Sequence, residues 1–320
     1  MQATINSGLV DATYHLPGPR LDICDWGPEN RVDAQRIERL LENGCRYFHD
    51  GSDYSDSELI IRAIEELVAH GHDVSSCRYL IHAHTQPFSM PAPPESILSN
   101  IIGQFSMNID ACFSTSQLAC ASIICAIDWA TKLLAMHSEE TQALVVTADR
   151  VFGKAKYRVR QDGGIQSDGA SALLLSNKHY RYLIKRIDFK HFPTVHEGPE
   201  IKANDELVGR YTWLHSKQLF LEHQDRMGIQ LSDYGAILPI NADRHYWHLI
   251  AKSLKVPDEL FFTRNIGERG HACCADFAIN LVDYGFECLE KGQLISACGQ
   301  SNIGSHGVIS LLPPEQGGSS

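Results

Sequence analysis

The spacing of hydrophobic residues along the chain predicts helices that alternate with short, strongly apolar strands. Apolar side chains that recur every three or four positions mark amphipathic helices at 32–47, 57–70 and 242–254. Apolar runs that are too short for a helix mark strands at 78–83, 142–148, 171–175, 236–240 and 294–298. This alternation is typical of α/β proteins whose sheets are covered by helices.

Two further segments begin with small residues and then become amphipathic. They are 119–134 (ACASIICAIDWATKLL) and 270–289 (GHACCADFAINLVDYGFECL), and an apolar strand follows each one. A helix that is small and apolar on every face at its start is expected at the centre of the molecule. The repetition favours two similar α/β halves, although two unrelated βα units would give the same pattern.

Composition narrows the class of protein. The 320 residues exceed a usual domain of ~100–200 residues, so we expect two domains or one large internally repeated unit. A net charge of −11 argues against nucleic acid as a partner. The absence of a long apolar run argues against a membrane span, and the N-terminal residues do not resemble a secretory signal. A cytoplasmic protein with reduced thiols is therefore expected.

The ten cysteines raise the question of metal binding or catalysis. The closest pairs are Cys120/Cys125 and Cys273/Cys274, and neither spacing suits a four-ligand zinc site, so no metal is expected. Glycine-rich phosphate loops are also missing, which argues against nucleotide binding. Most of the cysteines are expected to be small buried residues.

Cys120 is the best candidate for a nucleophile. It lies at the start of a predicted buried helix, where the helix dipole lowers the pKa of a thiol. If the two small-residue helix starts face each other, His271 would meet Cys120 and act as its base, and Asp276 would orient His271. The alternatives are a structural cysteine, a solvated loop histidine and an aspartate that only complements its helix dipole.

Several motifs, taken in order, resemble the 3-oxoacyl-acyl-carrier-protein synthase III branch of the thiolase superfamily. The resemblance rests on LACASIICAIDWA, ALVVTADR, SDGASALLL, YLIHAHTQPFSMPAPPESI and SNIGSHGVISLL, and it covers nearly the whole chain. It implies an α/β fold with five layers, αβαβα, built from two pseudo-symmetric halves. The expected halves are 1–175, with the nucleophile Cys120, and 176–320, with His271 and Asp276.

The chain departs from this family at two catalytic positions. Where the family has the histidine of a PHQAN-like motif, this sequence has Ile240, and where it has the asparagine of a GNTSAAS-like motif, this sequence has His271. Ile240 donates no hydrogen bond, and losing one oxyanion donor costs about 10²–10³ in rate. The set Cys120, His271 and Asp276 instead resembles the triad of synthase III-like acyltransferases from natural-product pathways.

That resemblance implies a function. Cys120 would take an acyl group from an acyl-carrier protein or from CoA. The CoA or phosphopantetheine thioester would be a substrate, and no bound cofactor is expected. The group would pass to a hydroxyl or amine of a small acceptor, with an oxyanion hole from the Cys120 N–H and the Gly304–Gly307 loop. The alternatives are a decarboxylative ketosynthase and a non-catalytic partner subunit of a ketosynthase heterodimer.

Other residues are expected to bind substrate or partner. The resemblance implies a homodimer in which Met90, within the Pro-rich loop 86–94, crosses to line the partner's acyl pocket; simple loop packing is the alternative. Ile240, Gly304 and Gly307 are also expected to bind substrate. A basic cluster would meet an acidic carrier protein or the CoA phosphates, unless it is only a solvated loop. It consists of Lys154, Lys156, Arg158 and Arg160.

Overall fold

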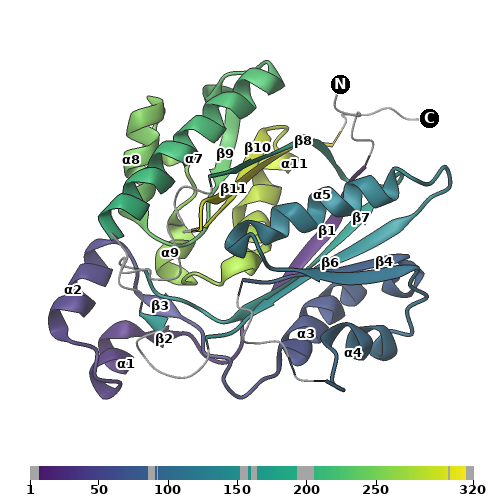
Figure 1. The fold of residues 1–320 in the computed structure, drawn as a ribbon, viewed down its shortest axis with the longest axis horizontal. Coiled ribbons are helices and arrows are strands. Elements are labelled where there is room, and N and C mark those ends of the chain that lie inside the picture. Colours follow the sequence, from purple (N-terminus) through teal and green to yellow (C-terminus); the bar gives the residue numbers. More distant parts are fainter. Residues whose placement is uncertain are drawn as a thin grey trace.

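The computed structural model describes residues 7–85, 91, 93–151, 158–159, 164–192, 205–301 and 303–314, with backbone only for 205–211 (Figure 1). The strands are β1 Gly8–His15, β2 Leu21–Asp22, β3 Tyr47–Phe48, β4 Tyr79–Ala83, β5 Ala111–Thr115, β6 Gln142–Asp149, β7 Gly169–Ser176, β8 Tyr182–His191, β9 Tyr234–Leu238, β10 Leu294–Gln300 and β11 Ser305–Leu311. The α-helices are α1 Ile23–Glu29, α2 Ala34–Glu42, α3 Asp56–Ala69, α4 Ile97–Gln104, α5 Ser122–Leu134, α7 Asp205–Met227, α8 Arg244–Leu254, α9 Arg264–Glu268, α10 Asp276–Asn280 and α11 Phe286–Glu290. Shorter turns are the 3₁₀ turns η1 Val74–Ser76, η3 Ala119–Ala121, η5 Leu231–Asp233, η6 Asp258–Leu260 and η7 Cys273–Ala275, and the π turn η8 Leu281–Gly285.

The large sheet contains the same arrangement of parallel and antiparallel strands twice. Its order is β5-β4-β6-β7-β1-β8-β11-β10-β9, and β1 joins β8 through only two residue pairs. On one side β4 and β6 are parallel, and β7 and β1 are antiparallel to their neighbours. On the other side β9 and β10 are parallel, and β11 and β8 are antiparallel. The match confirms the predicted pseudo-symmetry.

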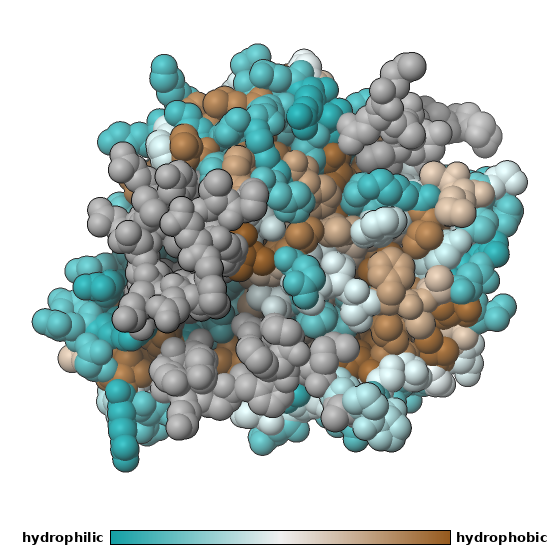
Figure 2. Space-filling view, viewed as in Figure 1, coloured by the Kyte–Doolittle hydropathy of each residue, from teal (hydrophilic) through white to brown (hydrophobic). Residues whose placement is uncertain are grey.

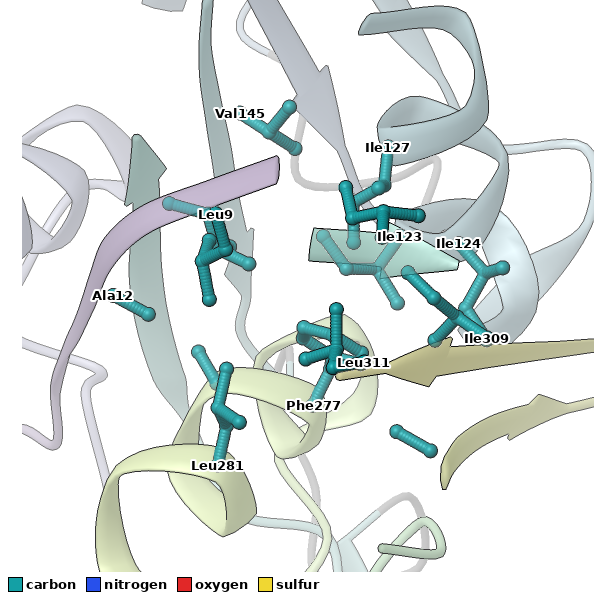
Figure 3. Close-up of a cluster of buried hydrophobic side chains, with 14 of the residues drawn as sticks. Leu9, Ala12, Ile123, Ile124, Ile127, Val145, Phe277, Leu281, Ile309 and Leu311 are labelled. Carbon is teal, nitrogen blue, oxygen red and sulfur yellow. The ribbon is translucent and has the colours of Figure 1, made fainter. Parts of the chain in front are cut away.

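We call the strands β5-β4-β6-β7-β1 the first sheet and the strands β8-β11-β10-β9 the second sheet. With the helices that cover their faces, these two sheets form five layers. The central layer contains α5 and the helical run that starts at α10, and both pack between the two sheets. Ile123 and Ile127 of α5 share one buried cluster with Phe277, Leu281 and Leu311, and Figure 3 shows Leu311 of the second sheet beside Phe277. The outer face of the first sheet carries α3 and α4, and that of the second carries α7 and α8. The predicted αβαβα fold is therefore confirmed.

Local sequence signals explain where the helices begin. Ser55 caps α3 with a complete capping box, since its hydroxyl accepts from the Glu58 N–H and the Glu58 carboxylate accepts from the Ser55 N–H. Asp33 and Asp243 cap α2 and α8 in the same way with their carboxylates. α3 then buries its apolar stripe against the first sheet, which is the face that the 3.6-residue period predicts.

Three predicted elements differ from the structure in their extent. The helix expected over 32–47 ends at Glu42, because Gly44 takes a left-handed φ of 80° and the chain turns into β3. The strand expected over 236–240 ends at Leu238, since Pro239 has no N–H for the ladder. The segment 270–289 is helical in four pieces, η7, α10, η8 and α11.

Part of the N-terminal sequence packs with the second half of the molecule. Ile23, Leu40 and Phe48 lie in one buried cluster with Trp247 and Ile250 of α8. Among the described residues, no helix is both long and apolar enough to cross a bilayer.

Candidate active site

Cys120 lies in a tight turn at the start of the central helix α5. The preceding residue, Ala119, has a left-handed φ of 48°, which an alanine rarely adopts. This turn places the Cys120 side chain at the N-terminal end of the helix, and 6% of the residue is exposed. Strand β10 passes against the Cys120 backbone at Gly299, where a Cβ would lie 2.9 Å from the Cys120 carbonyl oxygen. Only a glycine leaves room for that close approach.

His271 comes from the loop before the pseudo-symmetric turn η7. Its backbone is fixed by two hydrogen bonds, from its own N–H to the Ile165 carbonyl and from the Ser167 N–H to its carbonyl, each 2.9 Å long. The imidazole Nε2 lies 3.4 Å from Cys120 Sγ, and the ring is buried. A cysteine and its candidate base thus meet across the two halves of the fold, as the two facing helix starts predict.

Asp276 lies behind His271 and holds the other ring nitrogen. The His271 Nδ1–H donates to Asp276 Oδ2 over 2.5 Å. The same carboxylate accepts from the N–H of Asn241 and the N–H of Ala272, each over 2.7 Å. These donors fix the carboxylate, which in turn favours the imidazole tautomer whose Nε2 faces the thiol.

The charges of this site shift its pKa values in the directions that a thiolate–imidazolium pair needs. A hydrogen bond from Cys273 and the neighbouring His271 hold the pKa of Cys120 well below its usual value, although burial opposes the shift. Burial lowers the pKa of His271, but the charges of Asp276 and Cys120 more than compensate and raise it. Both shifts favour the thiolate form of Cys120 and the imidazolium form of His271.

Two further polar residues, Thr85 and Asp149, lie near Cys120. The Thr85 hydroxyl donates to Cys120 Sγ over 3.5 Å and lies 3.4 Å from Cys274 Sγ. Asp149, also buried, accepts from the N–H of Thr85 over 2.7 Å and from that of Cys274 over 3.2 Å. It thereby ties the end of β4 to η7.

Sequence reasoning assigned no role to Thr85, Cys273 or Asn241. The available signals were positional: Thr85 follows a predicted strand end, Cys273 lies in a small-residue helix start, and Asn241 follows Ile240. Each signal points to the neighbourhood of the site and none to a contact.

The predicted substrate-binding residues lie at different distances from this centre. Ile240 is buried in the same apolar cluster as Cys120 and Cys273. Gly307 pairs with Gly299, which lies against the Cys120 backbone, while Gly307 itself packs against Phe189 and Ile124. Gly304 takes a left-handed φ of 79° in the preceding turn. Met90 lies outside the described residues.

Arg158 is placed differently from the exposed basic cluster that the sequence predicts. Its guanidinium is buried, donates to both oxygens of Asp168 at 2.9 and 3.3 Å, and lies 3.3 Å from Asp50. A buried arginine is stable only when paired in this way, so Arg158 is not available for docking a donor. Lys154, Lys156 and Arg160 lie outside the described residues.

Comparison with known proteins agrees with this architecture. No protein-family model and no curated protein matches the chain. Among solved structures, 3-oxoacyl-acyl-carrier-protein synthase III from Aquifex aeolicus has a TM-score of 0.82 at 16% identity, covering 96% of this chain and 99% of that one. ChlB3, described as an acyltransferase, has 0.81 at 16% identity over 96% and 98%. Xanthomonas campestris OleA has 0.78 at 14% over 96% and 98%.

The chain has a thiolase fold of the synthase III type. At these identities the likeness establishes the fold, and the chemistry has to be argued from the site itself.

This thiolase fold also contains a second serine–histidine–aspartate arrangement, far from Cys120 in the sequence. His223 Nε2 lies 2.7 Å from Ser310 Oγ, and His223 Nδ1 lies 2.7 Å from Asp188 Oδ2. Ser310 has no exposed surface, and Tyr234 Oη lies 2.7 Å from its Oγ. Arg186 and Arg226 both donate to Asp188. Because no reactant can reach Ser310, we interpret this cluster as a buried structural network.

Proposed function

We propose that the protein is a thioester-dependent acyltransferase with Cys120 as nucleophile, His271 as base and Asp276 as orienting residue. The observation that carries the proposal is the line of contacts from Cys120 Sγ to His271 Nε2 and from His271 Nδ1 to Asp276 Oδ2. A nucleophile, a base within reach and a group that orients the base are the elements of covalent acyl transfer.

In the first step the Cys120 thiolate attacks the carbonyl carbon of an acyl thioester. The negative charge moves to the carbonyl oxygen, and the N–H of Cys120 at the helix start, with one from the Gly304–Gly307 loop, would stabilise it. When the tetrahedral intermediate collapses, the carbon–sulfur bond of the donor breaks. His271 gives its Nε2 proton to the departing thiolate, and the acyl group remains on Cys120.

In the second step a hydroxyl or amine of a small acceptor replaces the donor thiol. His271 Nε2, now unprotonated, takes the acceptor's proton as the acceptor attacks the acyl carbon. The bond to Cys120 breaks, the ester or amide leaves, and the thiolate–imidazolium pair is restored. Asp276 stabilises the imidazolium in both steps through the 2.5 Å contact with Nδ1.

Two observations favour transfer over decarboxylative condensation. The position that supplies a second hydrogen-bond donor in the synthase III enzymes holds Ile240, which lies buried and has only an apolar side chain. In addition, Asp276 holds His271 in the orientation of a general base, which is the role that deprotonation of an acceptor hydroxyl or amine requires. Condensation by His271 alone is the second candidate.

The donor is proposed to be acyl-CoA or an acyl-carrier protein, because both present the phosphopantetheine thioester that Cys120 would attack. The place of the reaction in a natural-product pathway belongs to the same proposal. It is supported by the likeness of the fold to ChlB3, which is described as an acyltransferase, and by the Cys–His–Asp set.

Product analysis tests the proposal. The protein is incubated with an acyl-CoA series and a panel of small alcohols and amines, with and without malonyl-CoA. We expect esters or amides whose formation is lost in Cys120→Ala and is independent of malonyl-CoA. Release of CO₂ with a carbon–carbon product would instead assign the enzyme to the ketosynthases.

We also propose that the protein is a homodimer that pairs through β5. This strand forms one end of the sheet, and within the described residues only β4 pairs with it. Its residues Ala111 and Cys112 are exposed, and so are Trp129 (49%) and Met136 (75%) on and after α5. Figure 2 shows apolar surface over the region where Figure 1 labels β4 and α5. An exposed sheet edge beside apolar side chains fits a second copy of the same chain. Light scattering of a Trp129→Glu variant, which places a charge on this exposed apolar surface, should show a shift to monomer.

A further inference from the structure

Three groups that commonly bind metal ions converge at the nucleophile. Cys120 Sγ, His271 Nε2 and Cys273 Sγ all lie within 4.8 Å of one another, and all three residues are buried. Cys273 is not a member of the proposed triad, although its hydrogen bond helps to lower the pKa of Cys120. The third ligand therefore gives the site a capacity that the triad alone lacks.

We propose that Cys120, His271 and Cys273 together form a Zn²⁺ site with one open coordination position. Two thiolates and one imidazole are a ligand set that zinc prefers, and three protein ligands leave room for water. As the metal–ligand bonds form, the Cys273 thiol and the protonated Nε2 of His271 each release a proton to solvent, and Cys120 binds as the thiolate. The two thiolates then neutralise the charge of the ion within the buried site.

The distances fit tetrahedral zinc. Zinc–sulfur and zinc–nitrogen bonds of about 2.3 and 2.0–2.1 Å place two ligand atoms on one zinc roughly 3.5–3.8 Å apart. Cys120 Sγ and His271 Nε2 are 3.4 Å apart, so a small movement admits the ion between them. Cys273 donates a hydrogen bond to Cys120. The sulfur of Cys273 therefore already lies next to the position that the ion would take.

The surroundings resemble a prepared metal site in two respects. The Asp276 carboxylate holds His271 Nδ1 at 2.5 Å, which directs the Nε2 lone pair at the ligand position as carboxylates do behind zinc-bound histidines. The buried carboxylate of Asp149, bound to the N–H groups of Thr85 and Cys274, adds negative charge beside the thiols. Both features favour a cation.

Zinc binding has a consequence that rests on the proposed function. The sulfur of Cys120 cannot bind zinc and carry an acyl group at the same time. Zn²⁺ and the acyl donor would therefore exclude each other, and a chelator would restore acyl loading to the zinc-bound protein.

Cys274 provides a matched control for Cys273. It is the next residue, also buried, but its thiol donates to the Ala119 carbonyl over 3.5 Å and it is not among the three clustered ligands. Exposed thiols are removed first by Cys24→Ser and Cys112→Ser, which gives the parent protein. Cys273→Ser and Cys274→Ser are then made in that parent, and circular dichroism and thermal unfolding verify their folds.

The experiment measures the Zn²⁺ affinity of the three proteins by competition with a chromophoric chelator. We expect one equivalent of zinc in the parent and in Cys274→Ser, and an affinity lower by at least about 10-fold in Cys273→Ser, the smallest loss usual even for outer-sphere partners. Zn²⁺ should also slow alkylation of Cys120 by iodoacetamide in the parent but not in Cys273→Ser. Equal zinc affinities of the two variants, or no stoichiometric binding to the parent, would overturn the site.

Failure of this site and failure of the proposed function give different results. Zinc affinity and alkylation are measured without any acyl donor, and acyl loading is measured separately in the presence of a chelator. A protein that binds zinc through Cys273 but never accepts an acyl group keeps the metal site and removes the transferase.

Discussion

The molecule contains two hydrogen-bonded sets of a cysteine or serine, a histidine and an aspartate. Their contacts are similar, but the two sets differ in backbone setting and in exposure. In one set Cys120 starts a central helix after a strained residue, and part of it is exposed. In the other set Ser310 is the last residue but one of β11 and is fully buried. The histidine–aspartate distances are similar, 2.5 Å for His271 and 2.7 Å for His223.

The contrast shows that a row of three side chains does not by itself make an active site. The Cys120 thiol is next to a helix start, which supplies positive potential and free N–H groups for a developing oxyanion. Ser310 instead meets Tyr234 and His223 on a regular strand, whose N–H groups pair with neighbouring strands. Access and a supply of free donors separate catalysis from a structural network.

Removing the candidate nucleophile or its base should have the largest effect. Cys120→Ala should abolish acyl loading, and His271→Ala should slow it by roughly 10²–10⁴-fold, the usual contribution of a general base. Loading is measured by intact-protein mass spectrometry over time. Ser310→Ala is the matched control from the other set, and a comparable loss there would reverse the assignment of the two sets.

Asp276→Asn should have an intermediate effect. The variant keeps the shape of the side chain and loses the charge that stabilises the His271 imidazolium. A charge-assisted hydrogen bond contributes about 1.5–3 kcal/mol, which corresponds to roughly 10- to 150-fold in rate. The loading rate should fall by at least that range. The thermal unfolding midpoint should fall as well, because the side-chain NH₂ of asparagine would meet the N–H of Asn241 or of Ala272 in place of a carboxylate oxygen. An unchanged rate would show that Asp276 does not act through His271.

Ser310→Ala should change stability and leave loading intact. The variant removes the partner of both Tyr234 Oη and His223 Nε2, which stay buried. Leaving a buried polar group without a partner costs about 1–3 kcal/mol, and urea unfolding measures that loss. If loading fell instead with no change in stability, the buried network would have to take part in the reaction.

The smallest expected effect concerns stability in acid. Burial alone would raise the pKa of Asp188, but hydrogen bonds from His223, Arg186 and Arg226 hold it well below its usual value. Asp188 therefore stabilises the fold above an unfolded pKa of about 3.9, and this stability is lost as the pH falls further toward the folded pKa. Thermal unfolding is measured from pH 6 down to pH 3, a range that includes the unfolded pKa of about 3.9. The unfolding midpoint should fall more steeply with decreasing pH for the wild type than for Asp188→Asn. Parallel curves would contradict the assignment.

The sequence predicts much of this architecture because periodicity reports on burial. The apolar strands and the two small-residue helix starts are local patterns, and their repetition already implies facing halves. The contact between Cys120 and His271 follows from that symmetry. The sequence could not predict contacts between residues that only the folded chain brings together. Examples are the contact of Asn241 with Asp276 and that of Thr85 with Cys120.

Arg158 shows the opposite failure of sequence reasoning. It lies within a run of basic residues, GKAKYRVR, which is typical of a solvated surface. In the structure its guanidinium points inward and pairs with Asp168, ten residues further along the chain, and with Asp50 from the first part of the chain. A charge is buried only where distant partners supply the opposite charge, and no local pattern records where those partners will be.

Peptide mapping after exposure to an acyl thioester tests the central claim most directly. Wild-type protein is mixed with acyl-CoA, quenched in acid, digested and sequenced by mass spectrometry, with His271→Ala treated in parallel. The account predicts one acyl group on the peptide that contains Cys120, formed much more slowly in the variant and lost when an acceptor alcohol or amine is added. An acyl group on another residue, or equal loading of both proteins, would contradict it.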